Sequence, residues 1–466
     1  MKLPIYAHDA DYSHPREVVW NWYDSDGAFR RIMPEWEKLK PQNRIDGIKN
    51  GDVNTFKMKI GVVPQTWKAE HFDVVPGERF QDKMTKGPFK KWVHKHEFIE
   101  VGEHNSKLED RVDWKLPFHF FTKFFSGILV TPRMKQMFRH RTRRVKADLN
   151  RHQTYANSPK QRILVSGSTG LIGEQLVAFL LTGGHEVHRL IRKSTKLAPD
   201  ANKKNVVLWD DIEGKIIEGS LENFDAIIHL AGAGIGDKRW NKKRKKLIRD
   251  SRVIPTRNLV ELTTSLKNPP SVFISGSAIG FYGNRGDESL DESSESGNGY
   301  LSETCKAWEH ATETLDKTDI RKVIIRTGIV TTPKGGALEK LLFPAKMGAM
   351  GPVGGGKQMQ SWISLDDQIF AIHHLLMNKE LEGVFNLVAP NPVNQKTFAK
   401  ALGKTLSRPA FAPLPGFVIK IMFGEMGKNL VLDGQGVRPK RLLESGYTFE
   451  HENIEHCLQD ALGRWR

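Results

Sequence analysis

The sequence predicts an α/β chain in which a doubly wound parallel sheet with a C-terminal α/β subdomain follows a smaller α+β domain. Three observations lead to this fold class: a length of 466 residues, alternating apolar and polar residues between 52 and 116, and short apolar runs after residue 162. A chain of this length is too long for one core, so two or three domains are expected. Hydrophobic residues make up 39% and charged residues 27%, the balance of a folded protein rather than a disordered one.

The first third of the chain has the pattern of a helix, an antiparallel meander and a second helix. Residues 14–32 predict the first helix, and residues 131–151 predict a longer basic one. Between them, five stretches alternate apolar with polar residues and are separated by Pro and Gly turns. A curved sheet that wraps a helix satisfies this pattern, so we expect a domain over residues 1–152. The five stretches are DVNTFKMKIG, TWKAEHFDVV, ERFQDKM, KWVHKHEFIEV and KLEDRVDWKL.

The periodicity changes after a polar, turn-rich boundary at TYANSPKQR. From Arg162 onward, β-branched runs alternate with helix-length segments, as buried parallel strands do in a sheet that helices cover on both faces. We expect this domain over residues 160–466, with a substrate-side α/β subdomain over residues 335–466. The predicted strands are RILVSG, HEVHRLI, NVVLW, DAIIHLAG, SVFISG and KVIIRTG.

The most specific motif is GSTGLIG, which lies between the strand RILVS and the helix that it opens. A pyrophosphate needs exposed backbone N–H groups at a helix N-terminus, where a Cβ would block its approach. Gly167 and Gly170 suit the turn and the approach, and Gly173 suits packing of the helix on the strand. The alternative interpretation is a structural glycine turn. The predicted dinucleotide-binding residues are Gly167, Ser168, Thr169, Gly170, Leu171, Ile172 and Gly173.

The second strand of this domain favours NADP over NAD. An NAD site usually has an acidic residue about 20 residues beyond the glycines, which binds the ribose 2′-hydroxyl. Arg192 and Lys193 stand at this distance instead, and a guanidinium can pair with a 2′-phosphate. The alternatives are a solvated strand end and, for Asp210, a cap of the next turn. Further cofactor contacts are expected at Asp210, Leu230, Ala231, Gly232, Ser275, Lys306 and Arg326.

The motifs GSTGLIG, HLAGAG, SGSAIGFYG and RTGIV follow one another in this order, with KAWE before the last. On these motifs, the region from about 162 to 460 resembles extended short-chain dehydrogenases/reductases, and more narrowly their divergent epimerase-like branch. The resemblance implies a Rossmann fold. It also implies an NADP-dependent oxidoreductase or epimerase that acts on a hydroxyl or carbonyl of a small organic substrate.

The sequence departs from this family at the catalytic pair. These enzymes use a Tyr and a Lys four residues later on one helix face, and the Lys lowers the pKa of the Tyr. In GYLSETCKAWE, Ser302 occupies the Tyr position before Lys306. The candidates for a replacement acid are Tyr300 and Tyr282, and Ser277 is the candidate that orients the substrate oxygen. The alternative is an NADP-binding sensor or regulatory protein with altered or lost chemistry.

The N-terminal third resembles START and polyketide-cyclase-like (SRPBCC) domains, on HPREVVWNWYDSDGAFRRIMPEWE, the alternating strands and the closing helix. The resemblance implies a helix-grip fold with an apolar cavity for a hydrophobic ligand, and a filled core is the alternative. The aromatic segment LPFHFFTKFFSGILV precedes a basic helix, which leaves peripheral membrane contact as a minor hypothesis. His94 and His96 share one strand face, but the sequence shows no third ligand, so we expect no metal site.

The net charge of +17 comes from two segments, because residues 133–162 contribute +9 and residues 238–249 contribute +8. These basic segments are either solvated helix faces or surfaces that bind phosphates or an anionic membrane. No recognition module accompanies them, so specific nucleic-acid binding is not indicated. Cys305 and Cys457 are the only cysteines, too few for a disulfide framework. With no signal peptide and no apolar stretch of 18 residues, we expect a cytoplasmic protein.

Overall fold

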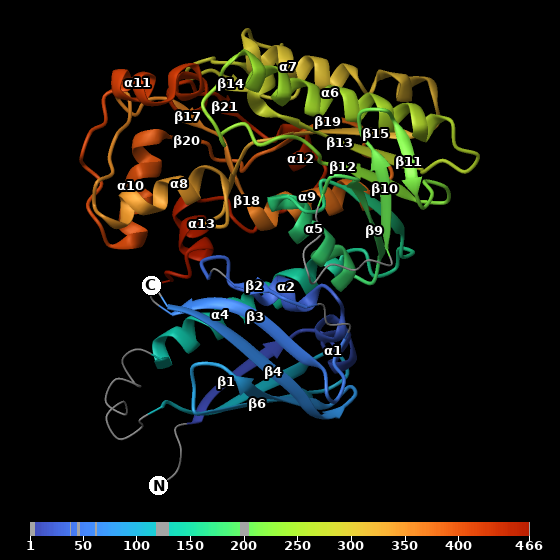
Figure 1. Ribbon diagram of the computed structural model, residues 1–466, viewed down its shortest axis with the longest axis vertical. Helices are drawn as coiled ribbons and strands as arrows, with labels where there is room; N and C mark the ends of the chain where they lie inside the picture. The colour runs from blue at the N-terminus through green and yellow to red at the C-terminus, as the bar shows by residue number, and fades with distance from the viewer. Residues whose placement is uncertain are drawn as a thin grey trace. The chain divides into compact units, whose positions relative to one another are not determined.

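The computed structural model describes residues 5–37, 39–43, 47–60, 63–117, 130–195 and 205–465. The chain forms two compact units, the first built mainly on the residues up to Ser158 and the second mainly on the residues from Pro159. Figure 1 labels the helices and strands of both units. The aromatic segment predicted from Phe118 to Phe125 lies outside the described residues.

An antiparallel sheet of seven strands forms most of the first unit, in the order β1-β7-β6-β5-β4-β3-β2. The five predicted strands are confirmed as β3 to β7. The sequence pattern missed β1, because His8 interrupts its apolar alternation and its partner β7 lies about a hundred residues away. The strands are β1 (Ile5–Tyr12), β2 (Lys40–Pro41), β3 (Val53–Ile60), β4 (Val63–Val75), β5 (Arg79–Lys86), β6 (Lys91–Glu100) and β7 (Ser106–Lys115).

The predicted first helix is divided into α1 (Arg16–Asp24) and α2 (Ala28–Ile32). The division occurs because Ser25 has an extended backbone, with φ −77° and ψ 151°, which ends α1. The predicted basic helix is confirmed as α4 (Thr131–Gln153). Not all of its charge faces solvent, since Asp148 of α4 pairs with Arg31 of α2 in a buried ion pair.

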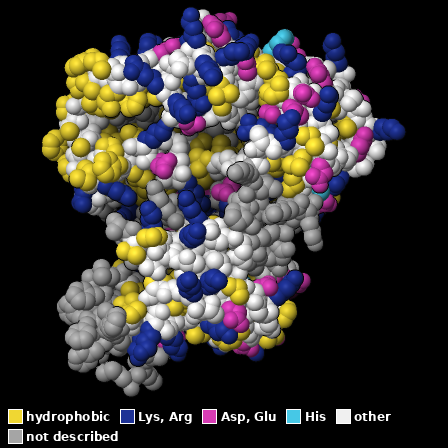
Figure 2. All heavy atoms as spheres, viewed as in Figure 1, with side chains coloured by type: hydrophobic (Ala, Val, Ile, Leu, Met, Phe, Trp, Pro, Cys, Tyr) yellow, Lys and Arg dark blue, Asp and Glu magenta, His cyan; other side chains and the backbone are white. Residues whose placement is uncertain are grey.

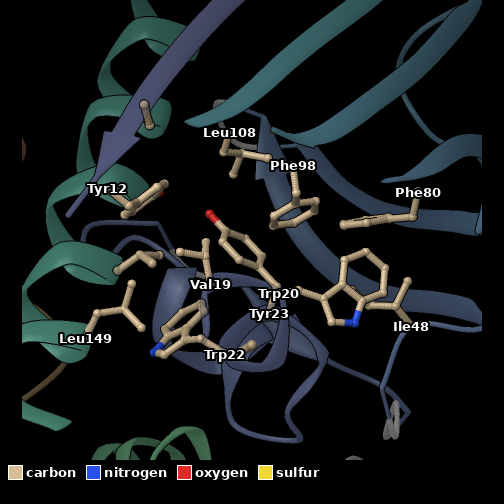
Figure 3. Close-up of a cluster of buried hydrophobic side chains, with 13 residues drawn as sticks. Tyr12, Val19, Trp20, Trp22, Tyr23, Ile48, Phe80, Phe98, Leu108 and Leu149 are labelled. Atoms are coloured by element: carbon tan, nitrogen blue, oxygen red, sulfur yellow. The ribbon is translucent and has the colours of Figure 1, made fainter. Parts of the chain in front are cut away.

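The core of the first unit is aromatic. One cluster, shown in Figure 3, brings the rings of Trp20, Tyr23, Phe80 and Phe98 together between α1 and the sheet. A second cluster gathers Trp67, Trp92, Trp114 and Phe138 of α4. Side chains of the sheet therefore pack directly against α1 and α4, and the unit is an α+β structure with a long helix against an antiparallel sheet.

An eight-stranded sheet forms the centre of the second unit, in the order β11-β10-β9-β8-β12-β13-β15-β19. All neighbouring pairs are parallel except β10 and β11, and the six predicted strands are confirmed. The chain order reverses between β8 and β12, which makes a topological switch point. The strands are β8 (Arg162–Ser166), β9 (Glu186–Arg192), β10 (Val206–Asp210), β11 (Lys215–Glu218), β12 (Ala226–His229), β13 (Val272–Ala278), β15 (Arg321–Thr327) and β19 (Gly383–Leu387).

The segment predicted as a C-terminal subdomain contributes to the main sheet as well as to a separate cluster. Its strand β19 is the last strand of the sheet, and Arg441 donates hydrogen bonds to the outer carbonyls of Glu382 and Val384. A separate apolar cluster includes Trp362, Leu402 and Leu458. The helices of the unit include α5 (Leu171–Thr182), α6 (Lys242–Thr264), α7 (Tyr300–His310), α8 (Gly336–Lys346), α9 (Leu365–Met377), α10 (Gln395–Leu406), α11 (Gly416–Gly427), α12 (Lys440–Glu444) and α13 (Ile454–Ala461).

The surface of the second unit mixes charged and apolar side chains (Figure 2). Lys and Arg are spread over the visible face, and a hydrophobic patch lies over α10 and α11. Exposed apolar side chains in this C-terminal region are Phe343, Met347, Phe411, Phe417, Ile421 and Met422. Among the described residues, no helix is both long and apolar enough to cross a membrane.

Candidate dinucleotide-binding and active site

The loop after β8 is built so that only glycine fits at two of its positions. Gly167 has a φ of +69°, and a Cβ there would lie 2.7 Å from the carbonyl carbon of Leu230 at the end of β12. A Cβ on Gly173 would lie 2.3 Å from the carbonyl oxygen of Gly167. Gly167 therefore makes the turn, and Gly173 lets α5 approach the loop, which are the roles that the sequence pattern assigned to them.

Gly170 differs from the other two glycines because the space beside it is open. A Cβ there would meet only the Gly167 carbonyl oxygen, at 3.2 Å. Thr169 and Gly170 are exposed, at the point where the Glu174 N–H donates to the Gly170 carbonyl and α5 begins. Beside them, the Ser168 hydroxyl is buried and has no hydrogen-bond partner among the described residues. The loop thus presents a shallow, glycine-lined surface at a helix N-terminus, which suits a phosphate group.

Two basic residues stand at the end of β9, the strand beside β8. Lys193 pairs with Asp210 at the end of β10, whereas the Arg192 guanidinium is 53% exposed and lies 3.8 Å from Asp211. Asp210 also accepts hydrogen bonds from the backbone N–H groups of residues 212 and 213. The hydrogen bond from Lys193 is the main cause that lowers the pKa of Asp210 to about 2. Asp210 therefore caps the turn, and Arg192 is the more available of the two cations.

The end of β12 borders the glycine loop through its backbone. Leu230 and Ala231 lie against Gly167, and a Cβ on Gly232 would lie 3.1 Å from the guanidinium carbon of Arg252. At His229, the last residue of β12, the ring Nδ1 lies 2.5 Å from the hydroxyl of Ser166. Burial lowers the pKa of His229 to about 4, so this imidazole is neutral at pH 7.

A buried polar network connects the ends of β13 and β15. The Glu309 carboxylate of α7 accepts hydrogen bonds from Ser277 at 2.6 Å and from Arg326 at 2.8 and 2.9 Å. Arg326 also donates to the Tyr282 hydroxyl at 3.0 Å, and this hydroxyl donates to Asn386 at 2.8 Å. The structure therefore brings three predicted site residues, Ser277, Tyr282 and Arg326, to one place, around a carboxylate that was not predicted.

The other predicted residues lie apart from this network. The Tyr300 hydroxyl donates to the Lys245 carbonyl of α6 at 2.7 Å, and its ring packs against Trp240. Ser275 is buried, with only a 3.4 Å contact to the next carbonyl. Lys306 is exposed and lines an open groove of about 1160 Å³ together with Glu309.

Ser302, at the position expected for the catalytic Tyr, is fully buried. Its oxygen lies 2.8 Å from the carbonyl oxygen of Phe281 and 2.7 Å from that of Gly297, and these two acceptors share its single hydrogen. These bonds fix the start of α7 against the loop after β13. Ser302 is therefore a structural residue, and its hydroxyl does not face the open groove.

Sequence reasoning missed Glu309 and Asn386 as partners of the site residues. Glu309 belongs to the KAWE motif, and its signal was an acid directly after the buried Trp308 of the helix. Asn386 had no local signal, because its contact with Tyr282 joins residues 104 positions apart.

Comparisons with known proteins agree with this geometry. The model of the NAD dependent epimerase/dehydratase family matches residues 163–387, and a domain of unknown function, DUF1731, matches residues 414–461. Epimerase family protein Mb2239 of Mycobacterium bovis is 35% identical over 304 residues, which are 65% of this chain and 98% of that protein. The chain belongs to the NAD-dependent epimerase/dehydratase family.

Two solved structures are also similar to this epimerase-family chain. A nucleoside-diphosphate sugar epimerase from Corynebacterium glutamicum is 30% identical, with a TM-score of 0.79, and the match covers 98% of this chain and 90% of the other. Human epimerase family protein SDR39U1, solved with NADPH, is 31% identical with a TM-score of 0.60. That match covers 65% of this chain and all of the human chain. The first of these matches includes the antiparallel N-terminal unit as well as the Rossmann-like sheet.

The residues of this family member fit a nicotinamide dinucleotide. The glycine surface at the start of α5 would hold the pyrophosphate, since a larger side chain at Gly170 would occupy its place. The orphaned Ser168 hydroxyl lies beside that surface and has no internal acceptor among the described residues. Neither Tyr282 nor Tyr300 has a free hydroxyl, because both hydroxyls already donate hydrogen bonds within the protein.

Proposed function

We propose that the protein is an NADP-dependent oxidoreductase or epimerase that acts on a hydroxyl or carbonyl group of a small organic substrate. The observation that carries this proposal is the loop of Gly167, Gly170 and Gly173 at the switch point of the sheet. In doubly wound folds, ligands bind beyond the carboxyl ends of the strands at this point. When bound, a nicotinamide supplies hydride transfer to or from a carbon atom of the substrate.

The choice of NADP rests on Arg192. Its guanidinium is mostly exposed at the end of the strand next to the glycine loop, where an acidic residue would serve an NAD enzyme. Lys193 is engaged by Asp210, so Arg192 is the cation that would pair with a 2′-phosphate. The human relative SDR39U1, whose structure is with NADPH, supports the same choice.

Lys306 and the Ser277–Glu309 pair are the groups that we assign to the substrate side. Lys306 is assigned to a ribose or substrate hydroxyl on its place three residues before Glu309 in the motif, because the groove that it lines runs past Lys322 at the start of β15, whereas the glycine loop follows the carboxyl end of β8. Ser277 donates its hydroxyl hydrogen to the Glu309 carboxylate at 2.6 Å, so its oxygen can still accept a hydrogen bond from a substrate hydroxyl and orient it.

A fluorescence titration of the full-length protein with NADPH and with NADH tests the cofactor. We expect NADPH to bind at least ten-fold more tightly than NADH, and Arg192→Glu to remove this preference. Lys215→Glu is a matched charge reversal on the nearby edge strand β11 and should leave both affinities unchanged. Equal weakening of both cofactors by Arg192→Glu, or no binding of either cofactor, would contradict the proposal.

The second candidate is an NADP-binding sensor or regulatory protein without turnover. The observation that favours it is the engagement of every hydroxyl near the expected catalytic position, since Ser302, Tyr282 and Tyr300 all donate to internal acceptors. A screen of carbonyl substrates with NADPH separates the two candidates. Turnover that Lys306→Ala abolishes, with NADPH affinity retained, favours the enzyme, whereas binding without turnover across the screen favours the sensor.

For the first unit we propose a START-like or polyketide-cyclase-like helix-grip domain that holds a hydrophobic ligand. The antiparallel sheet with α4 against its aromatic inner face supports this proposal. The match to the corynebacterial structure, which covers 98% of this chain, supports it as well. Native mass spectrometry of the purified full chain should then detect a bound apolar molecule that organic extraction releases, and a single unliganded mass would argue against the ligand.

A further inference from the structure

A row of polar side chains crosses the inner face of the antiparallel sheet in the first unit, between its two aromatic clusters. Adjacent strands contribute Asp82 of β5, His94 and His96 of β6, and Asp110 of β7. The strand register places Asp82 opposite His94 and His96 opposite Asp110. Both imidazoles and Asp110 are buried, with side chains 2–5% exposed, so this row is an interior feature.

Three of these residues direct ligand atoms at one point. Asp82 Oδ2 lies 3.4 Å from His94 Nδ1 and 3.3 Å from His96 Nε2, and the three atoms lie within 4.8 Å of one another. In tetrahedral zinc sites, metal–ligand bonds of about 2.0–2.1 Å separate the ligand atoms by about 3.3 Å. The spacing of the three atoms therefore matches the edges of a metal coordination polyhedron.

The fourth residue occupies the position of an outer-shell partner. Asp110 Oδ1 lies 2.8 Å from His94 Nε2 and 2.7 Å from His96 Nδ1, the ring nitrogens that do not face Asp82. Histidines that bind a metal commonly donate their second N–H to a carboxylate, which fixes the tautomer and the ring orientation. Asp110 thus holds His94 through a hydrogen bond to Nε2 and lies beside Nδ1 of His96, whereas Nε2 of His96 is hydrogen-bonded to Asp82 and would give up that hydrogen to bind a metal ion.

The neighbouring aromatic rings hold the two imidazoles in place. The ring of Phe80 stacks on His96 with centroids 4.0 Å apart, and the edge of Phe138 meets His94. Arg141 of α4 lies 3.8 Å from Asp110 and faces the outer carboxylate rather than the three ligand atoms. Asp82 is the most exposed member, at 16%, so an ion can reach the cluster from its side.

We propose that Asp82, His94 and His96 bind a divalent transition-metal ion in the first unit, with Asp110 as the carboxylate that orients both imidazoles. Two imidazoles and one carboxylate are a ligand set that takes Zn²⁺ or Fe²⁺ and leaves a coordination position for water or a substrate oxygen. The sequence showed His94 and His96 without a third ligand. The structure supplies that ligand from the neighbouring strand β5. The proposal concerns residues of the first unit alone and is independent of the cofactor site.

Titration of the chelator-treated full-length protein with Co²⁺ and Zn²⁺ tests the site. We expect about one ion per chain, visible Co²⁺ absorption bands of a site with nitrogen ligands, and displacement of Co²⁺ by Zn²⁺. His96→Ala and Asp82→Asn should weaken binding at least ~100-fold, and Asp110→Asn by about 10–100-fold as an outer-shell change. His14→Gln replaces another buried imidazole of the first unit, beside Ser106 at the start of β7, and should leave metal affinity unchanged.

Near-ultraviolet circular dichroism of each variant reports whether the first unit is folded, because the core of that unit is rich in tryptophan and tyrosine. X-ray absorption at the zinc edge of the wild-type protein supplies a readout that needs no variant, and it should count two imidazoles. Absence of stoichiometric binding by the wild type would overturn the proposal and leave the four residues as a proton-linked ion network. Equal metal binding by His96→Ala and the wild type would overturn it as well.

Discussion

At the scale of single residues, the three glycines of the nucleotide loop serve different purposes, and substitutions should separate them. A side chain on Gly173 meets the Gly167 carbonyl at 2.3 Å, so Gly173→Val overpacks the loop and should lower the free energy of unfolding by about 1–3 kcal/mol. A Cβ on Gly170 has one near neighbour, the Gly167 carbonyl oxygen at 3.2 Å, so Gly170→Val should lower the free energy of unfolding by less than Gly173→Val does.

The two variants should behave differently toward the cofactor. Gly170→Val places its side chain where the pyrophosphate approaches, so NADPH affinity should fall at least ~100-fold in a stable protein. Urea denaturation together with NADPH titration measures both quantities. Normal NADPH affinity in Gly170→Val would mean that the phosphate binds elsewhere.

His229 should make stability depend on pH. Burial lowers its folded-state pKa to about 4, whereas the unfolded value is 6.5, so the unfolded chain takes up the proton first as the pH falls. The contribution of His229 is therefore complete above pH 6.5 and is lost progressively between pH 6.5 and 4, by about 3 kcal/mol in all. Urea denaturation from pH 4 to 7 should show a shallower pH slope in His229→Leu than in the wild type. An identical slope would show that His229 titrates normally in the folded protein.

At the scale of elements, α7 is positioned by a residue that would serve catalysis in other members of the family. Ser302 ties the start of α7 to the carbonyl oxygens of Phe281 and Gly297, and a Cβ on Gly297 would lie 2.1 Å from the Tyr282 carbonyl oxygen. Because Ser302 itself is fully buried, a ring at position 302 would have to displace its neighbours.

Ser302→Tyr should therefore destabilise the protein rather than create an active tyrosine. We expect the free energy of unfolding to fall by at least 1–3 kcal/mol, with no gain in turnover of any carbonyl substrate. Ser302→Ala is the matched control and should cost about 1 kcal/mol for its lost hydrogen bonds. A stable, more active Ser302→Tyr variant would show that the loop of residues 281–297 moves aside.

Local sequence patterns predicted those helices, strands and loops whose structure is determined by neighbouring residues. The six buried strands of the second unit and the glycine loop each follow from neighbouring residues, and all were placed correctly. The break at Ser25 was missed because one residue with an extended backbone interrupts an otherwise helical pattern, and the strand β1 was missed because its partner β7 is distant in the chain. The pairing of Glu309 with Arg326, and of Asp82 with His94, depends on which strands and helices become neighbours, and one sequence carries no direct signal of that.

At the scale of the whole molecule, the chain separates its two candidate ligand sites between two compact units. The glycine loop lies in the second unit, and the His94–His96 cluster lies in the first. A ligand stabilises the state that binds it, by about 2.7 kcal/mol when its concentration is 100 times Kd. The effect of each ligand should therefore be strongest in its own unit.

Hydrogen exchange read out by peptide mass spectrometry can locate these effects. Saturating NADPH should slow exchange in peptides that contain β8, the start of α5 and the end of β9. Peptides from β5, β6 and β7 should change much less. Equal protection in both sets of peptides would indicate that NADPH binding is coupled to the fold of the antiparallel unit.

The two edge strands of the parallel sheet affect whether the protein aggregates at high concentration. Strand β11 runs antiparallel along β10 at one edge, and at the other edge Arg441 donates to the carbonyl oxygens of Val384 in β19 and of Glu382 just before it. Unpaired border strands invite strand addition by other chains, which begins aggregation. Truncation before α12 would uncover the β19 carbonyls, so a fragment that ends at residue 438 should form oligomers where the full chain stays dispersed. We therefore expect the C-terminal segment to prevent self-association at the β19 edge, in addition to its contribution to the core.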